Sequence, residues 1–231
     1  MADRVMIVTG GFGSLGRVVV RVAAERGWRV AALDLAPSSP TDLSADKGWI
    51  EAEPGVDLTD PDSAKKAIES VVSRHGRLDA LLNIAGGFRW TPVADSDAAV
   101  WDLLFRMNVQ SAVNASRAAI PHLIASGAGR IVCVGAGAAE RAGVGMGPYA
   151  ASKSGVHRFT ESLAEELKAK GVTVNAVLPS IIDTPQNRAD MPDADPATWV
   201  SPTELADVML FLASEQASAV TGALVRVPGR V

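Results

Sequence analysis

Tyr149 and Lys153 are the side chains in the sequence whose spacing best suits proton transfer. They lie four residues apart in PYAASKSGVHRFTESLAEEL, and Tyr149 is the only tyrosine in the chain. On a helix this spacing places both side chains on one face, within reach of a common ligand. A phenol has a pKa near ~10, which a neighbouring ammonium group can lower. The pair is a candidate proton donor, and a solvated pair on a helix surface is the alternative.

A glycine-rich segment follows the first apolar run of the chain. VTGGFGSLGR, residues 8–17, contains the pattern Gly11-x-Gly13-x-x-Gly16. Glycines let a backbone approach a pyrophosphate closely, and the start of a following helix adds N–H groups and a positive dipole. We therefore expect a dinucleotide to bind here. The predicted contacts are Gly10, Phe12, Gly13, Ser14, Leu15 and Gly16.

Two acidic residues are candidates for recognition of the nucleotide. Asp34 ends the second apolar run, where a carboxylate can accept hydrogen bonds from the adenine ribose and repel a 2′-phosphate. The next residue is Leu35 and not a base, so the sequence favours NAD over NADP, with Arg17 the one nearby cation. Asp57 is a candidate to bind the adenine amine. For both acids a simple turn role is the alternative.

Apolar runs and amphipathic stretches alternate along the chain. Strands are predicted at residues 4–9, 29–34, 78–85, 129–134, 172–178 and 223–227, with a weaker one within 49–58. Helices are predicted at 14–26, 61–75, 97–125, 148–170 and 202–213. The runs are apolar nearly throughout, as in strands covered on both faces. This predicts a single α/β domain over 1–231 with a doubly wound, mostly parallel sheet and helices on both faces.

Two segments are predicted to lie outside these elements. Residues 36–48 are expected to form a surface loop. Residues 183–200, which contain several prolines and acids, are expected to form a mobile substrate loop over one end of the sheet.

Composition and charge exclude several classes of function. The chain has 231 residues, 48% of them hydrophobic, and a net charge of −4 without a dense basic run, so no nucleic-acid partner is expected. No apolar run approaches the ~20 residues of a membrane-spanning helix. Cys133 is the only cysteine and lies in an apolar run, which predicts a buried small side chain and a cytoplasmic protein without disulfides. His75, His122 and His157 lack the spacing of metal ligands, so no metal is expected.

Five segments together resemble the short-chain dehydrogenase/reductase family, and the resemblance covers essentially the whole chain. They are VTGGFGSLG (8–16), NIAG (83–86), MNVQSA (107–112), YAASK (149–153) and NAVLPSIIDTP (175–185). The resemblance implies a Rossmann-type fold and NAD(P)-dependent oxidoreductase activity on a small molecule. It also implies a homodimer or homotetramer paired through the helices at 97–125 and 148–170.

The same resemblance implies a role for each residue of the motifs. Tyr149 would exchange a proton with the substrate. Lys153 would lower the pKa of Tyr149, helped by the nicotinamide cation, and would hold the nicotinamide ribose. Asn108 would anchor a water in the proton relay. Further cofactor contacts would come from Asn83, Ala85, Gly86, Pro179, Ile182 and Thr184.

One position departs from the family pattern. The family usually carries a serine 13 residues before the tyrosine, where its hydroxyl donates a hydrogen bond to the substrate oxygen. Here the position is Ala136, and CVGAGAAERAG around it contains no serine or threonine. Loss of such a donor costs on the order of 10²–10³ in rate for an acyl-type oxyanion. The substrate therefore needs little polarisation, or the protein is slow or non-catalytic.

The quinonoid dihydropteridine reductases are the subgroup that this pattern resembles most. The resemblance lies in GGFGSLG (10–16), AGGF (85–88), Ala136 and AVLPSIIDTPQNRADMPDAD (176–195). An electron-poor dihydropterin accepts hydride without a serine. Asn108 is not a feature of that subgroup.

Two other functions stay open. One is a generic carbonyl reductase or alcohol dehydrogenase, similar to 3-oxoacyl reductases. The other is an NAD-binding regulatory or scaffold protein without turnover. Substrate contacts are expected from Ala136, Phe88, Met146 and Trp199, with packing inside their loops as the alternative for the last three.

Overall fold

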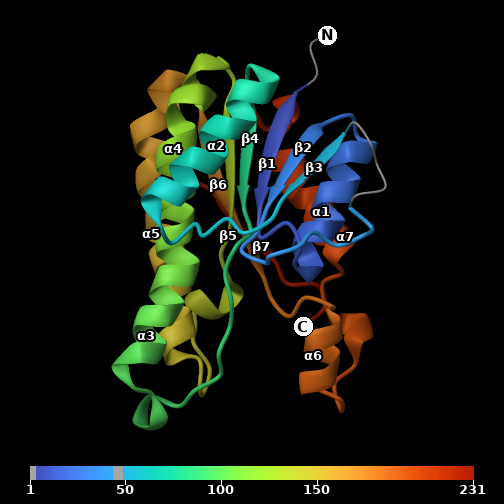
Figure 1. Cartoon of the computed structure of the whole chain (residues 1–231). Helices are drawn as coiled ribbons and strands as arrows, with labels where there is room; N and C mark the ends of the chain where they lie inside the picture. The colour runs from blue at the N-terminus through green and yellow to red at the C-terminus, as the bar shows by residue number, and fades with distance from the viewer. Residues whose placement is uncertain (1–3, 44–48) are drawn as a thin grey trace.

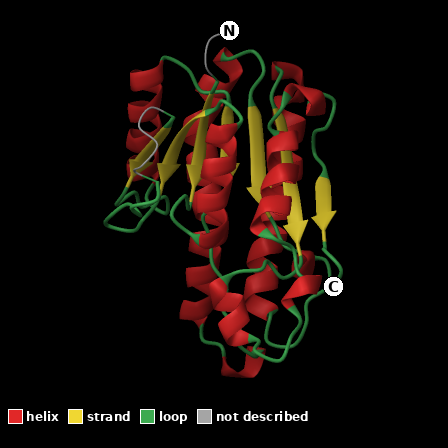
Figure 2. Cartoon of the chain, turned by 90° about the vertical axis from the view of Figure 1, so that its right-hand side faces the viewer, coloured by secondary structure: helices red, strands yellow, loops and turns green. Residues whose placement is uncertain are grey.

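The computed structural model describes residues 4–43 and 49–231. Within these residues seven strands form one sheet in the order β3-β2-β1-β4-β5-β6-β7, and every neighbouring pair is parallel. The strands are β1 (Val5–Thr9), β2 (Arg29–Leu33), β3 (Ile50–Glu53), β4 (Ala80–Asn83), β5 (Arg130–Val134), β6 (Thr173–Pro179) and β7 (Leu224–Val227). The arrowheads in Figure 2 all point toward the same end of the sheet.

Helices cover both faces of this sheet (Figure 1). They are α1 (Ser14–Glu25), α2 (Pro61–His75), α3 (Ala98–Phe105), α4 (Ser111–Ala125), α5 (Gly147–Leu167), α6 (Pro185–Asp190) and α7 (Pro202–Leu212). One face carries α2, α4 and α5, and the other carries α1 and α7. The predicted single-domain, doubly wound α/β fold is confirmed.

Successive residues of a strand enter opposite cores. In β1, Val5 and Ile7 join the core under α2, α4 and α5, whereas Met6 and Val8 join the core under α1 and α7. Side chains alternate across a strand, so a strand between two helical layers must be apolar on both sides. This explains the continuous apolar runs, and the predicted strands are confirmed, including the weaker one at β3.

The start signals of two helices act as predicted. Asp60 caps α2 by accepting a hydrogen bond from the backbone N–H of Asp62. Ser201 caps α7 in a capping box with Glu204, and each helix has a proline in its first turn.

The structure differs from the sequence prediction in two segments. The single helix expected at 97–125 is divided into α3, a π-helical turn at Arg106–Gln110, and α4. The loop expected at 183–200 contains the short helix α6 and a 3₁₀ turn at Pro196–Thr198. Of the loop predicted at 36–48, residues 44–48 lie outside the described residues.

The strand order reverses between β1 and β4, which pair although β2 and β3 lie between them in the sequence. In open α/β sheets such a reversal opens a crevice at the carboxyl ends of the strands, where ligands bind. Both α3 and α6 lie beyond this end of the sheet (Figure 1).

Candidate active site

A cleft of about 1150 Å³ lies at the carboxyl end of the sheet. Its walls come from the segments that follow β1, β2, β4, β5 and β6 and from the first turns of α5. The cofactor candidates that line it are Gly10, Phe12, Gly13, Ser14, Leu15, Gly16, Asp34, Asp57, Ala85, Gly86, Tyr149, Lys153, Pro179, Ile182 and Thr184. The substrate candidates that line it are Phe88, Ala136 and Met146. Most of the predicted site is therefore gathered in one place.

The glycine-rich segment forms a tight turn into α1. Gly10 has φ 64°, and a Cβ there would lie 2.9 Å from the backbone of Ala85. A Cβ at Gly16 would lie 2.1 Å from the carbonyl oxygen of Gly10. Both positions therefore require glycine, Gly10 because of its left-handed conformation and Gly16 because helix and turn pack so closely.

The first turn of α1 leaves its N–H groups free for a ligand. Its N-cap is Gly13, and no side chain caps the helix. In contrast, Asp60 and Ser201 cap α2 and α7. An uncapped helix start at the edge of the cleft suits a pyrophosphate, since the orphan N–H groups and the dipole both favour an anion. Ser14 is the first residue of the helix and provides a backbone N–H in this turn, as a glycine at the same position would.

Asp34 joins the glycine turn to the end of β2. Its Oδ2 accepts a 2.9 Å hydrogen bond from the N–H of Phe12, and its Oδ1 accepts one of 3.0 Å from Ala36. Each oxygen keeps a further lone pair for a ligand. Arg17 is paired with Asp42 at 3.4 Å. Asp34 is thus both a turn residue and a wall of the cleft.

Asp57 also stabilises a turn and lines the cleft. Its Oδ1 accepts hydrogen bonds of 2.8 Å from the backbone N–H and from the hydroxyl of Thr59. Among the described residues that line the cleft, the acids are Asp34, Asp57 and Asp190, and the one cation is Lys153.

Tyr149 and Lys153 both face the cleft from α5. The ring of Tyr149 meets Phe88 edge to face, with centroids 4.9 Å apart and planes at 87°. Burial raises the pKa of Tyr149 to about 12. Burial lowers the pKa of Lys153 to about 8, and its Nζ donates a 2.8 Å hydrogen bond to the carbonyl oxygen of Val134. In the protein without a cofactor, burial is the cause that sets the pKa of Tyr149, and the effect of Lys153 together with a nicotinamide cation stays a prediction.

Asn108 lies in the π-helical turn and does not line the cleft. Its Oδ1 accepts a 2.8 Å hydrogen bond from the N–H of Gly87, and its Nδ2 donates to the carbonyl oxygen of Gly87 at 3.0 Å and to Ser152 Oγ at 2.9 Å. Asn108 thereby links the segment after β4 to α5. Both N–H donors of its amide are engaged, whereas Oδ1 keeps a second lone pair that could accept a hydrogen bond from the predicted relay water.

Two predicted contacts lie away from the cleft. Asn83 is buried in β4, and its Nδ2 donates a 3.0 Å hydrogen bond to Ser116 on α4. Trp199 is 5% exposed. Neither lines the cleft. The structure thus gives Asn83 a hydrogen bond into the helical layer and leaves Trp199 buried, and their contacts with cofactor and substrate stay predictions.

Ala136 places a methyl group where the family has a hydroxyl. It is 4% exposed, and its N–H donates a 3.3 Å hydrogen bond to Nε2 of His157. His157 is buried on α5, and burial lowers its pKa, which favours the neutral ring that accepts this bond. Since Lys153 bonds to Val134 on the same segment, α5 holds the chain after β5 at two points.

The segments after β4 and β5 are joined at the rim of the cleft. Trp90 Nε1 donates a 3.0 Å hydrogen bond to the carbonyl oxygen of Val144, and the N–H of Thr91 donates one of 2.8 Å to Gly145. A Cβ at Gly145, which has φ 73°, would lie 2.2 Å from the ring of Trp90. The two segments thus form one apolar wall.

Several lining residues were not found from the sequence. They are chiefly Met107, Ser111, Ile181, Asn187 and Met191. Met107 and Ser111 lie next to the Asn108 motif, which was the one available signal. Asn187 lies in α6 and Met191 directly follows it, in a segment that was expected to be a loop.

Other kinds of site find no support in the described part of the chain. Among residues 4–43 and 49–231, no three histidine, cysteine or acidic side chains group as metal ligands. No helix in the same ranges has the length and apolar character to span a bilayer. Cys133 is buried, as predicted.

Comparison with known proteins points to one family. A family model described as short chain dehydrogenase matches residues 4–195. The chain is 31% identical to the 3-oxoacyl-acyl-carrier-protein reductase of Thermotoga maritima, over 99% of this chain and 98% of that protein. It is 32% identical to the acetoacetyl-CoA reductase of Cupriavidus necator, over 96% of each. A short-chain type dehydrogenase/reductase from Mycobacterium ulcerans has a TM-score of 0.90 at 28% identity, covering 100% of this chain and 90% of that one.

Proposed function

The chain belongs to the short-chain dehydrogenase family of NAD(P)-dependent oxidoreductases, and from this premise we propose that it is an NADH-dependent carbonyl reductase. The observation that carries the proposal is the position of Tyr149 and Lys153 on one helix face at the apolar end of the cleft. The names of the two relatives support the carbonyl class, since both are reductases of 3-oxo thioesters. They favour this function over the dihydropteridine reductase hypothesis.

The residues of the cleft fit a dinucleotide. The free N–H groups of α1 and the glycine turn would hold its pyrophosphate, and Thr184 would add a hydroxyl. Asp34 would accept hydrogen bonds from the adenine ribose. Lys153 would hold the nicotinamide ribose. When bound, the reduced cofactor supplies the hydride and leaves a positive charge on its ring.

Tyr149 supplies the proton in this proposal. With a pKa of about 12, its phenol keeps its proton at neutral pH until negative charge develops on the substrate oxygen. The proton then passes from Oη to that oxygen, so that a ketone becomes an alcohol. Positive charge from Lys153 stabilises the phenolate that remains.

We propose NAD over NADP because of the charges near the glycine turn. Asp34 would lie against a 2′-phosphate and repel it. Arg17, which could have bound such a phosphate, is already paired with Asp42. The acids of the cleft outnumber its one lysine within the described residues, which adds to the same preference.

A quinonoid dihydropterin is the second candidate substrate, and Ala136 is the observation that favours it. The methyl group offers no hydrogen bond to a substrate oxygen, and the N–H of Ala136 is bonded to His157. A substrate that is electron-poor by itself needs no such donor. The exposed face of Phe88 also suits a flat ring.

NADH oxidation by wild type and by Ala136→Ser tests the proposal. Acetoacetyl-CoA, a panel of small ketones and quinonoid dihydropterin are the substrates. We expect ketone turnover in wild type and at least a tenfold rise in A136S, since the serine restores an oxyanion donor. Ala138→Ser, a change of the same kind at another lining position, serves as the control and should give no rise.

The other outcomes are equally distinct. Pterin turnover that is unaffected by A136S, without ketone turnover, would favour the second candidate. NADH binding without turnover of any substrate would contradict both and leave the regulatory or scaffold alternative.

Assembly and location remain predictions. We propose a homodimer or homotetramer in the cytoplasm, paired through α4 and α5. Light scattering at several protein concentrations measures the oligomeric state. Apolar side chains that remain exposed on α3, among them Leu103 and Phe105, lie close in the chain to the proposed contact and support an assembled state.

A further inference from the structure

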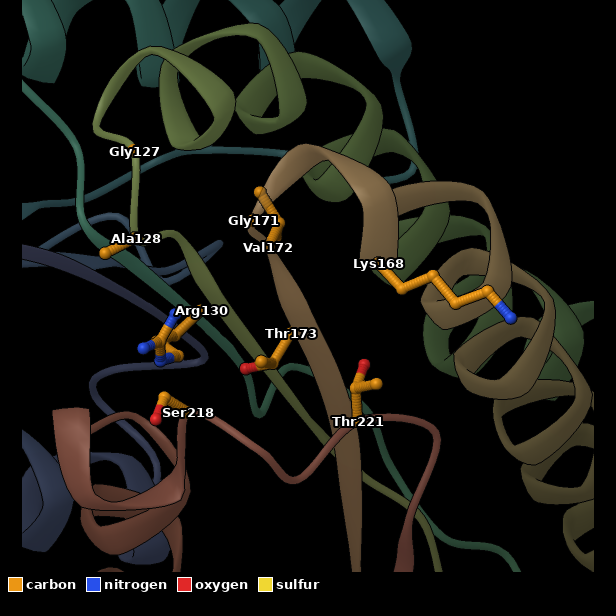
Figure 3. A pocket seen from close by; sticks show the side chains of 9 residues that line it. All are labelled: Gly127, Ala128, Arg130, Lys168, Gly171, Val172, Thr173, Ser218 and Thr221. Carbon is orange, nitrogen blue, oxygen red and sulfur yellow. The ribbon is translucent and has the colours of Figure 1, made fainter.

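A second hollow, of about 320 Å³, lies at the amino ends of β5 and β6, at the edge of the sheet opposite the cleft. We call it the amino-edge pocket. It is lined by Gly127, Ala128, Arg130, Lys168, Gly171, Val172, Thr173, Ser218 and Thr221 (Figure 3). None of these residues lines the cleft. A ligand here would thus be separate from the reacting substrate.

Arg130 is the buried cation of this pocket, with 3% of its surface exposed. Its Nε donates a 3.2 Å hydrogen bond to the carbonyl oxygen of Ser214, and its Nη1 donates one of 2.9 Å to Gly129. These bonds fix the guanidinium. In the described part of the chain its Nη2 has no hydrogen-bond partner, although a guanidinium has five N–H donors to satisfy.

The charges around Arg130 leave an excess of positive charge. Burial lowers the pKa of Arg130 and the nearby charge of Arg4 adds to this, whereas Glu215 raises the pKa of both arginines. Asp79, the other acid near Arg4, is paired with Arg77 at 2.7 Å. Three guanidinium groups, those of Arg4, Arg77 and Arg130, thus face the two carboxylates of Asp79 and Glu215, and the excess of one positive charge favours a bound anion.

Thr173 is the second sign of a missing partner. The residue is 7% exposed, and its Oγ1 is buried without a hydrogen-bond partner among the described residues. Figure 3 shows this oxygen turned toward Arg130, whereas the amine of Lys168 points away from it. A buried hydroxyl is costly unless something accepts its proton, and an anion beside Arg130 would do so.

We propose that the amino-edge pocket binds a phosphate group, either free or in a small phosphate ester. Arg130 would donate from Nη2 to its oxygens, Thr173 would donate its hydroxyl proton, and Ser218 at the mouth would add a second hydroxyl. A fixed guanidinium with hydroxyl neighbours is a donor set that matches a tetrahedral oxyanion. The pocket volume leaves room for a small group attached to the phosphate.

Calorimetric titration of the whole protein tests this proposal. Inorganic phosphate and glycerol 3-phosphate are titrated separately, with sodium chloride at matched ionic strength as the reference. We expect binding in wild type and roughly tenfold weaker binding in Thr173→Val, which removes a hydrogen bond to a charged ligand. Lys170→Ala, at an exposed lysine on the same 3₁₀ turn but outside the pocket lining, is the control and should bind as wild type does. The stronger of the two ligands identifies the free or the esterified form.

Thermal unfolding shows whether T173V folds as wild type does. Without phosphate, T173V should unfold no earlier than wild type, because valine has the shape of threonine and removes an unpaired hydroxyl. Phosphate should raise the Tm of wild type by a few degrees above the chloride reference and that of T173V by less. Equal phosphate affinity in the two proteins would place the ion elsewhere, for example at the start of α1, and would overturn the proposal. The proposal would also be overturned if phosphate had no effect on wild type beyond that of chloride.

Discussion

The Nζ atom of Lys153 donates a 2.8 Å hydrogen bond to the carbonyl oxygen of Val134, the last residue of β5. The lysine is 6% exposed, so its charge is held inside the protein by little more than this bond. Burial lowers its pKa from 10.5 to about 8. The buried charge of Lys153 therefore carries a cost in stability.

This cost predicts how stability depends on pH. The folded protein releases the Lys153 proton near pH 8, whereas the unfolded chain keeps it up to about pH 10.5. Between these values the unfolded state binds more protons, so the free energy of unfolding rises with pH. From pH 8 to 9.5 Lys153 should contribute a gain of up to about 2 kcal/mol.

Urea unfolding of wild type and Lys153→Met at pH 7.5 and 9.5 measures this gain. Cys133, whose pKa is raised by burial, adds an opposite trend and interacts with the charge of Lys153, so both proteins carry Cys133→Ala and the difference between them reports on Lys153. Lys168→Met, at an exposed lysine, is the control. The same pH dependence in wild type and K153M would contradict the assignment.

Removal of the Tyr149 hydroxyl should abolish turnover without loss of cofactor binding. Tyr149→Phe keeps the edge-to-face contact with Phe88, so the wall of the cleft stays intact. We expect kcat to fall by about 10²–10⁴ with the ketone substrates. NADH affinity, measured by fluorescence titration, should change less than twofold because the ring remains. A variant with wild-type turnover would show that another group supplies the proton.

Asp34 should determine the choice of cofactor. Asp34→Asn removes the negative charge but keeps an oxygen that can accept from Phe12 or Ala36. Without the repulsion of a 2′-phosphate, the ratio of kcat/KM for NADPH to that for NADH should rise about tenfold. Asp62→Asn, at an exposed acid on α2, should leave the ratio unchanged. An unchanged ratio in D34N would mean that other residues select the cofactor.

His157 should make the protein less stable in mild acid. Burial lowers its folded pKa below 6.5, so the unfolded chain takes up a proton first as the pH falls. Its contribution to stability is thus complete above pH 6.5 and decreases below it. Near it lie Glu140 and Glu161, which oppose this shift, and Arg158 and Lys153, which add to it.

Thermal unfolding of wild type and His157→Gln from pH 7.5 to 5 measures the effect. Wild type should lose more stability than the variant over this range, because glutamine does not titrate. His122→Gln, at a half-buried histidine on α4, is the control and should behave as wild type. Parallel loss of stability in wild type and H157Q would mean that other groups cause the acid sensitivity.

The fold could be predicted from the sequence because its strands lie between two helical layers. Such strands must be apolar on both sides, which leaves continuous runs that are easy to recognise. The capping residues Asp60 and Ser201 fixed two helix starts through local chemistry alone. The glycine turn before α1 was also predictable, because Gly16 meets a steric requirement within the turn itself.

The remaining features depend on contacts between distant segments. Asn83 lies in a motif, but only the position of α4 decides that its amide bonds to Ser116. The π-helical turn at 106–110 has no strong local signal and inserts Asn108 between the segment after β4 and α5. The pKa of Tyr149 depends on how deeply the cleft encloses it, which no spacing in the sequence can give.

The bond between Trp90 and Val144 also bears on how a substrate enters. This bond joins the segment after β4 to the segment after β5, so the two segments form one wall of the cleft. Facing it, α6 has no buried residue, and its side-chain hydrogen bonds stay between residues 182 and 190 in the described structure. One wall of the cleft is therefore held by hydrogen bonds between two segments, whereas the side-chain hydrogen bonds of α6 are all local within the described residues. We therefore expect exchange of the α6 segment to alter the range of substrates that the protein accepts, measured as kcat/KM over a ketone panel, without a change in NADH affinity.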